Sequence, residues 1–197
     1  HATVLARELS KKREKAVYLI AVGGDGTVNE VLNGITDFEK VRLGVIASGS
    51  GNDFGKGMGI PTDPIVCMRQ ILKCIRREKH GIPIKKTDLG QVTWGNGKKH
   101  RIFGISAGIG LDAIVCKKAL HSNCKKFLNR IHLGKLTYLA LTVQSLFTMD
   151  TAEAVVECGD NHKIYRLHKT IFAAAMNLPA EGGGVPMAPH ASCTDGM

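Results

Sequence analysis

An apolar run that leads directly into a glycine-rich turn occurs twice near the start of this chain. Residues 16–22 are apolar without alternation, which is typical of a strand covered on both faces in a parallel sheet. Residues 43–47 repeat this pattern and lead into a second turn at residues 48–53. A helical pattern follows each turn, and two such units in succession predict an open α/β sheet.

Apolar residues at helical spacing predict the helices of this region. The first turn is followed by such a series, which is Val28, Val31, Leu32 and Ile35. Asp63 and Pro64 predict the start of a later helix, as an N-cap and a first-turn proline. Its predicted buried face consists of Ile65, Met68, Leu72 and Ile75. At the start of the chain a partial stripe also predicts a helix, through Val4, Leu5 and Leu9.

The pattern changes after the basic segment 76–86, so we predict an α/β domain over residues 1–82 and a second domain over 83–197. Two predicted hairpins make the second domain mainly antiparallel β. The first turns at Asn96-Gly97, and the second turns at residues 159–161, after which residues 169–176 continue as a strand. A helical insertion between the hairpins shares one apolar face, made of Leu136, Leu139, Val143, Leu146 and Phe147.

The first turn carries the chemistry of a phosphate site. Gly23, Gly24 and Gly26 let backbone N–H groups approach phosphate oxygens, because no Cβ blocks the way. The positive end of the following helix adds about 0.3–1 kcal/mol per favourable charge, and Thr27 is placed to cap that helix. Asp25 would repel phosphate unless Mg²⁺ lies between them, so its presence suggests metal-assisted phosphoryl transfer. A glycine turn with an aspartate cap is the alternative interpretation.

The wider sequence resembles a known family. Residues 23–31 (GGDGTVNEV) resemble the signature of diacylglycerol kinases, sphingosine kinases and their bacterial lipid-kinase relatives, whereas NAD kinases and phosphofructokinases share only its core. Residues 49–61 (GSGNDFGKGMGIP) are similar to a second lipid-kinase loop that NAD kinases lack. Three later stretches agree in order, at residues 88–90, 103–112 and 182–196.

The resemblance implies a phosphofructokinase/NAD-kinase-like α/β domain followed by a mainly antiparallel β-sandwich, and it implies ATP and Mg²⁺ as cofactors. The residues that it assigns to ATP are Gly23, Gly24, Asp25, Gly26, Thr27, Val28, Asn29, Glu30, Ser50, Asn52 and Asp53. Ser50 replaces the family's usual threonine and keeps the hydroxyl. The residues that it assigns to a structural Mg²⁺ are Ser192, Asp195 and Met197.

The resemblance also implies that parts of the protein are missing from this sequence. It places the family's general base in a segment after Met197, which leaves Asp25 as the catalytic candidate within the chain. We therefore expect both natural ends of the protein to be missing from this sequence, including an early strand that also touches ATP in relatives.

The charge and composition of the chain indicate which binding partners are favoured. The formal net charge of +10 predicts attraction to polyanions, but aromatic residues are only 5% of the chain and no nucleic-acid module is present, so nucleic acid is disfavoured. No apolar run is long enough to span a membrane, and the cysteines form no disulfide framework or zinc spacing, so we expect a cytoplasmic protein that binds its lipid peripherally. Six cations without an intervening acid favour membrane docking or a solvated basic face, namely Lys117, Lys118, Lys125, Lys126, Arg130 and Lys135.

The sequence therefore predicts an ATP-dependent lipid kinase that phosphorylates a lipid hydroxyl, with diacylglycerol as first choice and a homodimer as the expected oligomer. Three alternatives stay open: an NAD kinase-like enzyme, a non-catalytic nucleotide- or lipid-binding module, and a nucleic-acid binder. A sphingoid base or a phosphatidylglycerol-like lipid stays open as the substrate.

Overall fold

The computed structural model describes residues 1–12, 15–121, 144–145, 148–159 and 162–196. Contacts within the chain divide it into two compact units, His1–Ser106 with Met176–Met197, and Ala107–Ala175. This grouping differs from the predicted boundary after residue 82. Residues up to 106 join the first unit because the side chains of Asn29 and Asn33 hydrogen-bond the backbone of Ile102.

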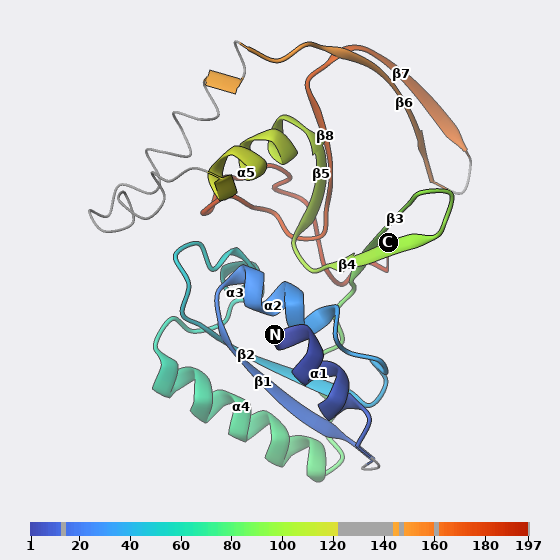
Figure 1. Ribbon diagram of the computed structural model, residues 1–197. Coiled ribbons are helices and arrows are strands. Elements are labelled where there is room, and N and C mark those ends of the chain that lie inside the picture. The colour runs from blue at the N-terminus through green and yellow to red at the C-terminus, as the bar shows by residue number, and fades with distance from the viewer. Residues whose placement is uncertain (13–14, 122–143, 146–147, 160–161, 197) are drawn as a thin grey trace. The chain divides into compact units, whose positions relative to one another are not determined.

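The first unit is built on two parallel strands, β1 (Val17–Gly23) and β2 (Val41–Ala47), paired in register over their full length. Figure 1 shows α1 (Ala2–Ser10) and α2 (Asp25–Leu32) on one face of this sheet and α4 (Pro64–Lys79) on the other. The short helix α3 (Asp53–Gly57) follows the second turn. The predicted parallel strands and their helices are confirmed.

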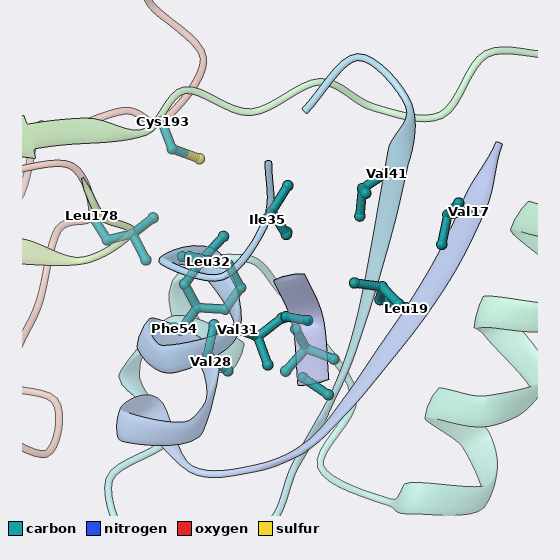
Figure 2. Close-up of a cluster of buried hydrophobic side chains, with 13 residues drawn as sticks. Val17, Leu19, Val28, Val31, Leu32, Ile35, Val41, Phe54, Leu178 and Cys193 are labelled. Atoms are coloured by element: carbon teal, nitrogen blue, oxygen red, sulfur yellow. The ribbon is translucent and has the colours of Figure 1, made fainter. Parts of the chain in front are cut away.

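One hydrophobic core lies between the sheet and α1 and α2 (Figure 2). Alternate β1 residues point into it, as the period-two geometry of a strand requires. The members of this core are Ala6, Val17, Leu19, Ala21, Val28, Val31, Leu32, Ile35, Val41, Val45, Phe54, Leu178 and Cys193. The helical series predicted after the first turn is therefore confirmed as buried. Leu178 and Cys193 bring the C-terminal segment into the same core.

The other face of β1 is less covered than the sequence predicts. Val22 is 61% exposed and Ile20 is 39% exposed, because α4 packs mainly on β2. Between α4 and the sheet lies a cavity of about 190 Å³, lined by side chains that include Ile20 and Ile71. The prediction that residues 16–22 are buried on both faces is therefore wrong.

Helix α4 begins as predicted but faces the sheet with different residues. The Asp63 carboxylate accepts hydrogen bonds from the N–H groups of Ile65 and Val66, at 2.8 and 2.9 Å. Cys67 is buried and donates its thiol hydrogen to the carbonyl oxygen of Val45, whereas Ile65 is 64% exposed and Leu72 is 45% exposed. The prediction is therefore wrong for Ile65 and Leu72, whereas Met68 and Ile75 are half-buried as part of the predicted face.

Helix α1, which the apolar stripe at the start of the chain predicts, is confirmed as a helix. Its buried residues are the small side chains of Ala6 and Ser10, and the apolar stripe is exposed. The close approach to α2 explains this, because a methyl group added to Gly34 would lie 2.3 Å from the carbonyl oxygen of Thr3. Only small residues fit at such a contact.

The remaining strands pair two by two. Both hairpins are confirmed, as β3 (Gly90–Trp94) with β4 (Lys99–Phe103), and β6 (Ala152–Cys158) with β7 (Lys163–Thr170). The strands β5 (Ser106–Gly110) and β8 (Phe172–Met176) also pair, and α5 (Leu111–His121), which the sequence analysis did not predict, follows β5. The strands of the described residues form no wider sheet, so the predicted β-sandwich is not seen there.

Two further predictions concern segments that the structure describes only in part. Leu136, Leu139, Val143, Leu146 and Phe147, the predicted helical insertion, lie outside the described residues, as do Lys125, Lys126, Arg130 and Lys135. Among the helices that are described, none combines the length and apolar character needed to cross a bilayer.

Candidate nucleotide site

The first glycine turn ends at the start of α2. Gly24 is the N-cap in extended conformation, and its carbonyl oxygen accepts hydrogen bonds from the N–H groups of Thr27 and Val28, at 3.0 and 3.1 Å. Thr27 therefore lies inside the helix, and the prediction that it caps the helix is wrong. The first N–H groups of α2, at Asp25 and Gly26, have no partner within the helix and can bind an anion.

The second turn is closed by Asn52. This residue adopts the left-handed conformation, with φ of 57°, and its side-chain amide bonds both the N–H and the carbonyl of Gly49 at 2.8 Å. Both polar atoms of the predicted ATP ligand Asn52 are thus engaged within the turn. Ser50 is exposed in the same turn, so its hydroxyl is accessible.

The two turns meet at the carboxyl ends of β1 and β2. The Ser48 N–H donates to the Gly23 carbonyl oxygen at 2.9 Å. A methyl group added to Gly49 would lie 2.5 Å from the Cα atom of Gly24, so only hydrogen atoms fit between these backbones. This edge of a parallel sheet is where open α/β folds bind ligands. The two predicted loops therefore form one continuous backbone surface.

Two carboxylates lie at this surface. Asp25 accepts a hydrogen bond from the Phe54 N–H at 3.0 Å, and thereby holds the start of α3 against α2. Asp53 is only 6% exposed and accepts a hydrogen bond from the Gly183 N–H at 2.6 Å. A methyl group added to Gly51 would lie 3.0 Å from an oxygen of Asp25 and 3.7 Å from one of Asp53, so both carboxylates flank this glycine.

Asp53 also supplies an unsatisfied oxygen. Its Oδ1 atom is buried and accepts no hydrogen bond from the residues that are described, and the nearest cation is the Lys56 ammonium group, at 3.8 Å. Buried carboxylate oxygens rarely lack partners, and carboxylates are the ligands that Mg²⁺ prefers. Asp53 and the neighbouring Asp25 therefore fit a magnesium ion that accompanies a nucleotide.

A third motif joins the site through Asp53. Gly182, Gly183 and Gly184 have φ values of 66°, 91° and 100°, which residues with a Cβ rarely adopt. Glu181 and Val185 close this turn with two backbone hydrogen bonds, and the Ser106 hydroxyl donates to the Glu181 carboxylate. The turn presents the Gly183 N–H to Asp53, which explains why three consecutive glycines stand there.

Three predicted ATP ligands have other contacts. Val28 is buried in the core, and the Asn29 oxygen accepts two hydrogen bonds from Arg101. Glu30 accepts from the amino group of His1 and from the Ala2 N–H, and these contacts hold the pKa of Glu30 below its ordinary value. Their role toward ATP stays a prediction.

Asn33 is a positioning residue that the sequence analysis missed. It donates to the Ile102 carbonyl oxygen at 2.8 Å and accepts from the Ile102 N–H at 2.9 Å. This pair of hydrogen bonds fixes β4 to the end of α2. Its only sequence signal is its spacing of four residues from Asn29, which bonds the same carbonyl.

The predicted structural metal ligands are only partly described. The hydroxyl of Ser192 lies 3.1 Å from that of Thr194, and Met197 lies outside the described residues. The Gly196 N–H donates to the Asp88 carboxylate at 2.9 Å, so this acid contacts the residue that follows Asp195. No group of three or more His, Cys, Asp or Glu side chains that could hold a metal occurs in the described part. This metal site stays a prediction.

Comparison with known proteins gives a consistent family. The model of the diacylglycerol kinase catalytic domain matches residues 1–82. A Bacillus subtilis protein named "Putative lipid kinase YtlR" is 32% identical over 98% of this chain, and a Bacillus subtilis diacylglycerol kinase is 30% identical over all of it. The chain covers 60% of the length of each of these two relatives.

Solved structures agree with the fold. The crystal structure of a diacylglycerol kinase from Bacillus anthracis str. Sterne is 25% identical, with a TM-score of 0.57, over 98% of this chain and 55% of that one. A second structure from the same organism, at 24% identity, covers 98% and 57% with a TM-score of 0.63 and supports the fold alone. The family-model match over residues 1–82 and the whole-chain relatives agree, so this chain is similar over its length to the diacylglycerol kinase family of lipid kinases.

Proposed function

We propose that this chain binds Mg·ATP on its two glycine turns and serves the transfer of the γ-phosphate to a lipid hydroxyl, with diacylglycerol as the first candidate. The observation that carries the proposal is the backbone contact between Gly24 and Gly49, with Asp25 and Asp53 on either side of Gly51. Phosphoryl transfer needs mainly positioning and charge stabilisation from a protein, and this surface offers both.

Each group at the surface has a proposed task. The N–H groups at the start of α2 bind phosphate oxygens, and the exposed hydroxyl of Ser50 adds a donor from the second turn. Asp25 and Asp53 hold the magnesium ion, which when bound neutralises phosphate charge. Asp25 is also the catalytic candidate of the described residues, while Gly183 keeps Asp53 in place through its N–H.

The proposal also includes the arrangement of the chain in two domains and its location. Parallel strands with helices on both faces support a phosphofructokinase/NAD-kinase-like first domain. The antiparallel hairpin of β6 and β7, in the unit Ala107–Ala175, supports a β-rich second domain. A cytoplasmic location with peripheral access to the membrane follows from a water-facing nucleotide site and a lipid acceptor.

The test is a transfer assay on the complete protein to which this sequence belongs, with ATP labelled at the γ-phosphate. Diacylglycerol, a sphingoid base and phosphatidylglycerol are offered separately in mixed micelles, and NAD is offered in buffer. Label in the extracted diacylglycerol is the expected result, and it should disappear in Asp25→Asn. Asp63→Asn is the matched control, since Asp63 caps α4 and has no proposed role in the chemistry.

Other outcomes separate the alternatives. Label on NAD with none on lipid would replace the proposal with an NAD kinase. Mg·ATP binding without transfer to any acceptor would favour a non-catalytic nucleotide-binding module.

A further inference from the structure

Helix α4 turns a mixed apolar and basic face away from the sheet. Three large apolar side chains on this face are exposed, namely Ile65, Val66 and Leu72. Five exposed cations accompany them, and these are Arg69, Lys73, Arg76, Arg77 and Lys79. We infer that these eight residues, the α4 outer face, dock on the surface of an anionic lipid bilayer.

The charge of the α4 outer face is uncompensated. The only acid within the helix, Glu78, is turned toward the sheet, where Arg42 and Tyr18 hydrogen-bond its carboxylate at 2.6 and 2.9 Å. Within the described part of the chain, no acid lies within ion-pair distance of the five cations. Each cation near an anionic bilayer raises the binding constant by about fivefold, so this face suits such a surface.

The apolar residues of the α4 outer face favour a lipid bilayer over nucleic acid as its partner. Ile65, Arg69, Leu72 and Arg76 follow one another at i, i+4, i+7 and i+11, so they form one line along the helix. Apolar side chains gain by burial among lipid headgroups and acyl chains, whereas nucleic acid offers phosphates and bases for cations and aromatic rings. The α4 outer face carries no aromatic residue.

The position of α4 relative to the glycine turns suits a lipid kinase. This step of the inference rests on the proposed function. Cys67 near the start of the helix contacts Val45, and Glu78 near its end contacts Arg42. The helix therefore runs antiparallel to β2, with its first turn at the end of the sheet that carries the glycine turns. Docking through Ile65 and its neighbours would hold this end of the sheet near the lipid substrate.

The experiment measures binding of the 197-residue chain to sedimenting vesicles at low salt. One set contains phosphatidylglycerol in phosphatidylcholine and the other contains phosphatidylcholine alone. Arg69→Gln/Lys73→Gln/Arg76→Gln removes three charges from the α4 outer face. Lys11→Gln/Lys98→Gln/Lys99→Gln removes three exposed charges elsewhere and is the matched control. A third variant, Ile65→Ser/Leu72→Ser, removes apolar surface without changing charge.

We expect the α4 charge variant to bind anionic vesicles about 100-fold more weakly than the parent, and the control to lose much less. The apolar variant should also bind more weakly, most visibly at high salt. Circular dichroism checks that each variant is folded. Equal losses in the two charge variants would overturn the inference, as would binding to duplex DNA in preference to vesicles.

The Mg·ATP-dependent thermal shift separates this inference from the proposed function. The α4 variants should keep the shift of the parent, because they do not touch the glycine turns. A parent chain that shows no shift, yet binds vesicles through α4, would contradict the proposed function and leave the inference standing.

Discussion

The Cα atom of Gly24 would lie 2.5 Å from a methyl group placed on Gly49, so the two glycine turns are in direct backbone contact. This contact joins segments that the sequence separates by a complete helix and strand. A single ligand can therefore touch both turns, and the account of the site depends on this proximity.

Gly49→Ala should separate the turns. The new methyl group meets backbone atoms that cannot rotate away, and overpacking of this kind costs about 1–3 kcal/mol. Chemical denaturation should show this loss, and the thermal shift with Mg·ATP should vanish. Gly26→Ala is the matched control for stability, since a methyl group there meets no atom within 4 Å and its helical position favours alanine. A fully stable Gly49→Ala variant would show that the turns are further apart.

Asp25 has a structural and a proposed chemical role, and two substitutions separate them. Asp25→Asn keeps an oxygen that can accept the Phe54 N–H, so stability should change little while lipid phosphorylation by the active kinase is lost. Asp25→Ala leaves this N–H without its partner and should cost about 1–3 kcal/mol in the free energy of unfolding. Wild-type turnover in Asp25→Asn would remove Asp25 from the chemistry.

The glycine turns were predictable because their signals are local. A buried strand, consecutive glycines and a helical series follow one another in the sequence, and no long-range contact is needed to place them. The partners of Asp53 and Asn33 were not predictable in this way. Gly183 and Ile102 lie far along the chain from these residues, and only the folded structure brings them together.

The faces of α1 and α4 show a second limit of sequence patterns. Helical spacing identified both helices, but Ile65 and Leu72 of α4, which were predicted to be buried, are exposed, and so is the apolar stripe of α1. Small side chains at Ala6 and Cys67 are buried instead, because these helices pack closely against α2 and β2. Hydrophobicity alone predicts the wrong face when close backbone approach favours small residues.

Asn33→Ala should loosen β4 from α2. The substitution leaves the N–H and the carbonyl of Ile102 without their side-chain partner, and an unsatisfied donor or acceptor of this kind costs about 1–3 kcal/mol. Urea denaturation should show the loss. Hydrogen exchange should show faster exchange at Ile102 than in the parent. Unchanged exchange there would mean that Asn33 does not fix this strand.

Stability should depend on Glu78 at acid pH. The hydrogen bond from Arg42 lowers the pKa of Glu78 from its ordinary value of 4.5, and the same carboxylate raises the pKa of Tyr18. A lowered pKa means that ionised Glu78 stabilises the fold above about pH 4.5, and that this contribution is lost as the pH falls through the folded-state pKa.

The measurement is melting temperature against pH for the parent and Glu78→Gln. The parent should be more stable at neutral pH, and the difference should close below about pH 4.5. Glu8→Gln, at an exposed position of α1, should follow the parent throughout. A constant difference between parent and Glu78→Gln at all pH values would contradict the ion pair.

Calorimetric titration of the chain with Mg·ATP, with NAD and the Gly49→Ala variant measured in parallel, shows whether the two turns together bind a nucleotide. We expect saturable binding of Mg·ATP to the parent, no comparable binding of NAD, and loss of ATP binding in Gly49→Ala. ATP binding that is absent from the parent, or unchanged in Gly49→Ala, would contradict a nucleotide site built from the two turns.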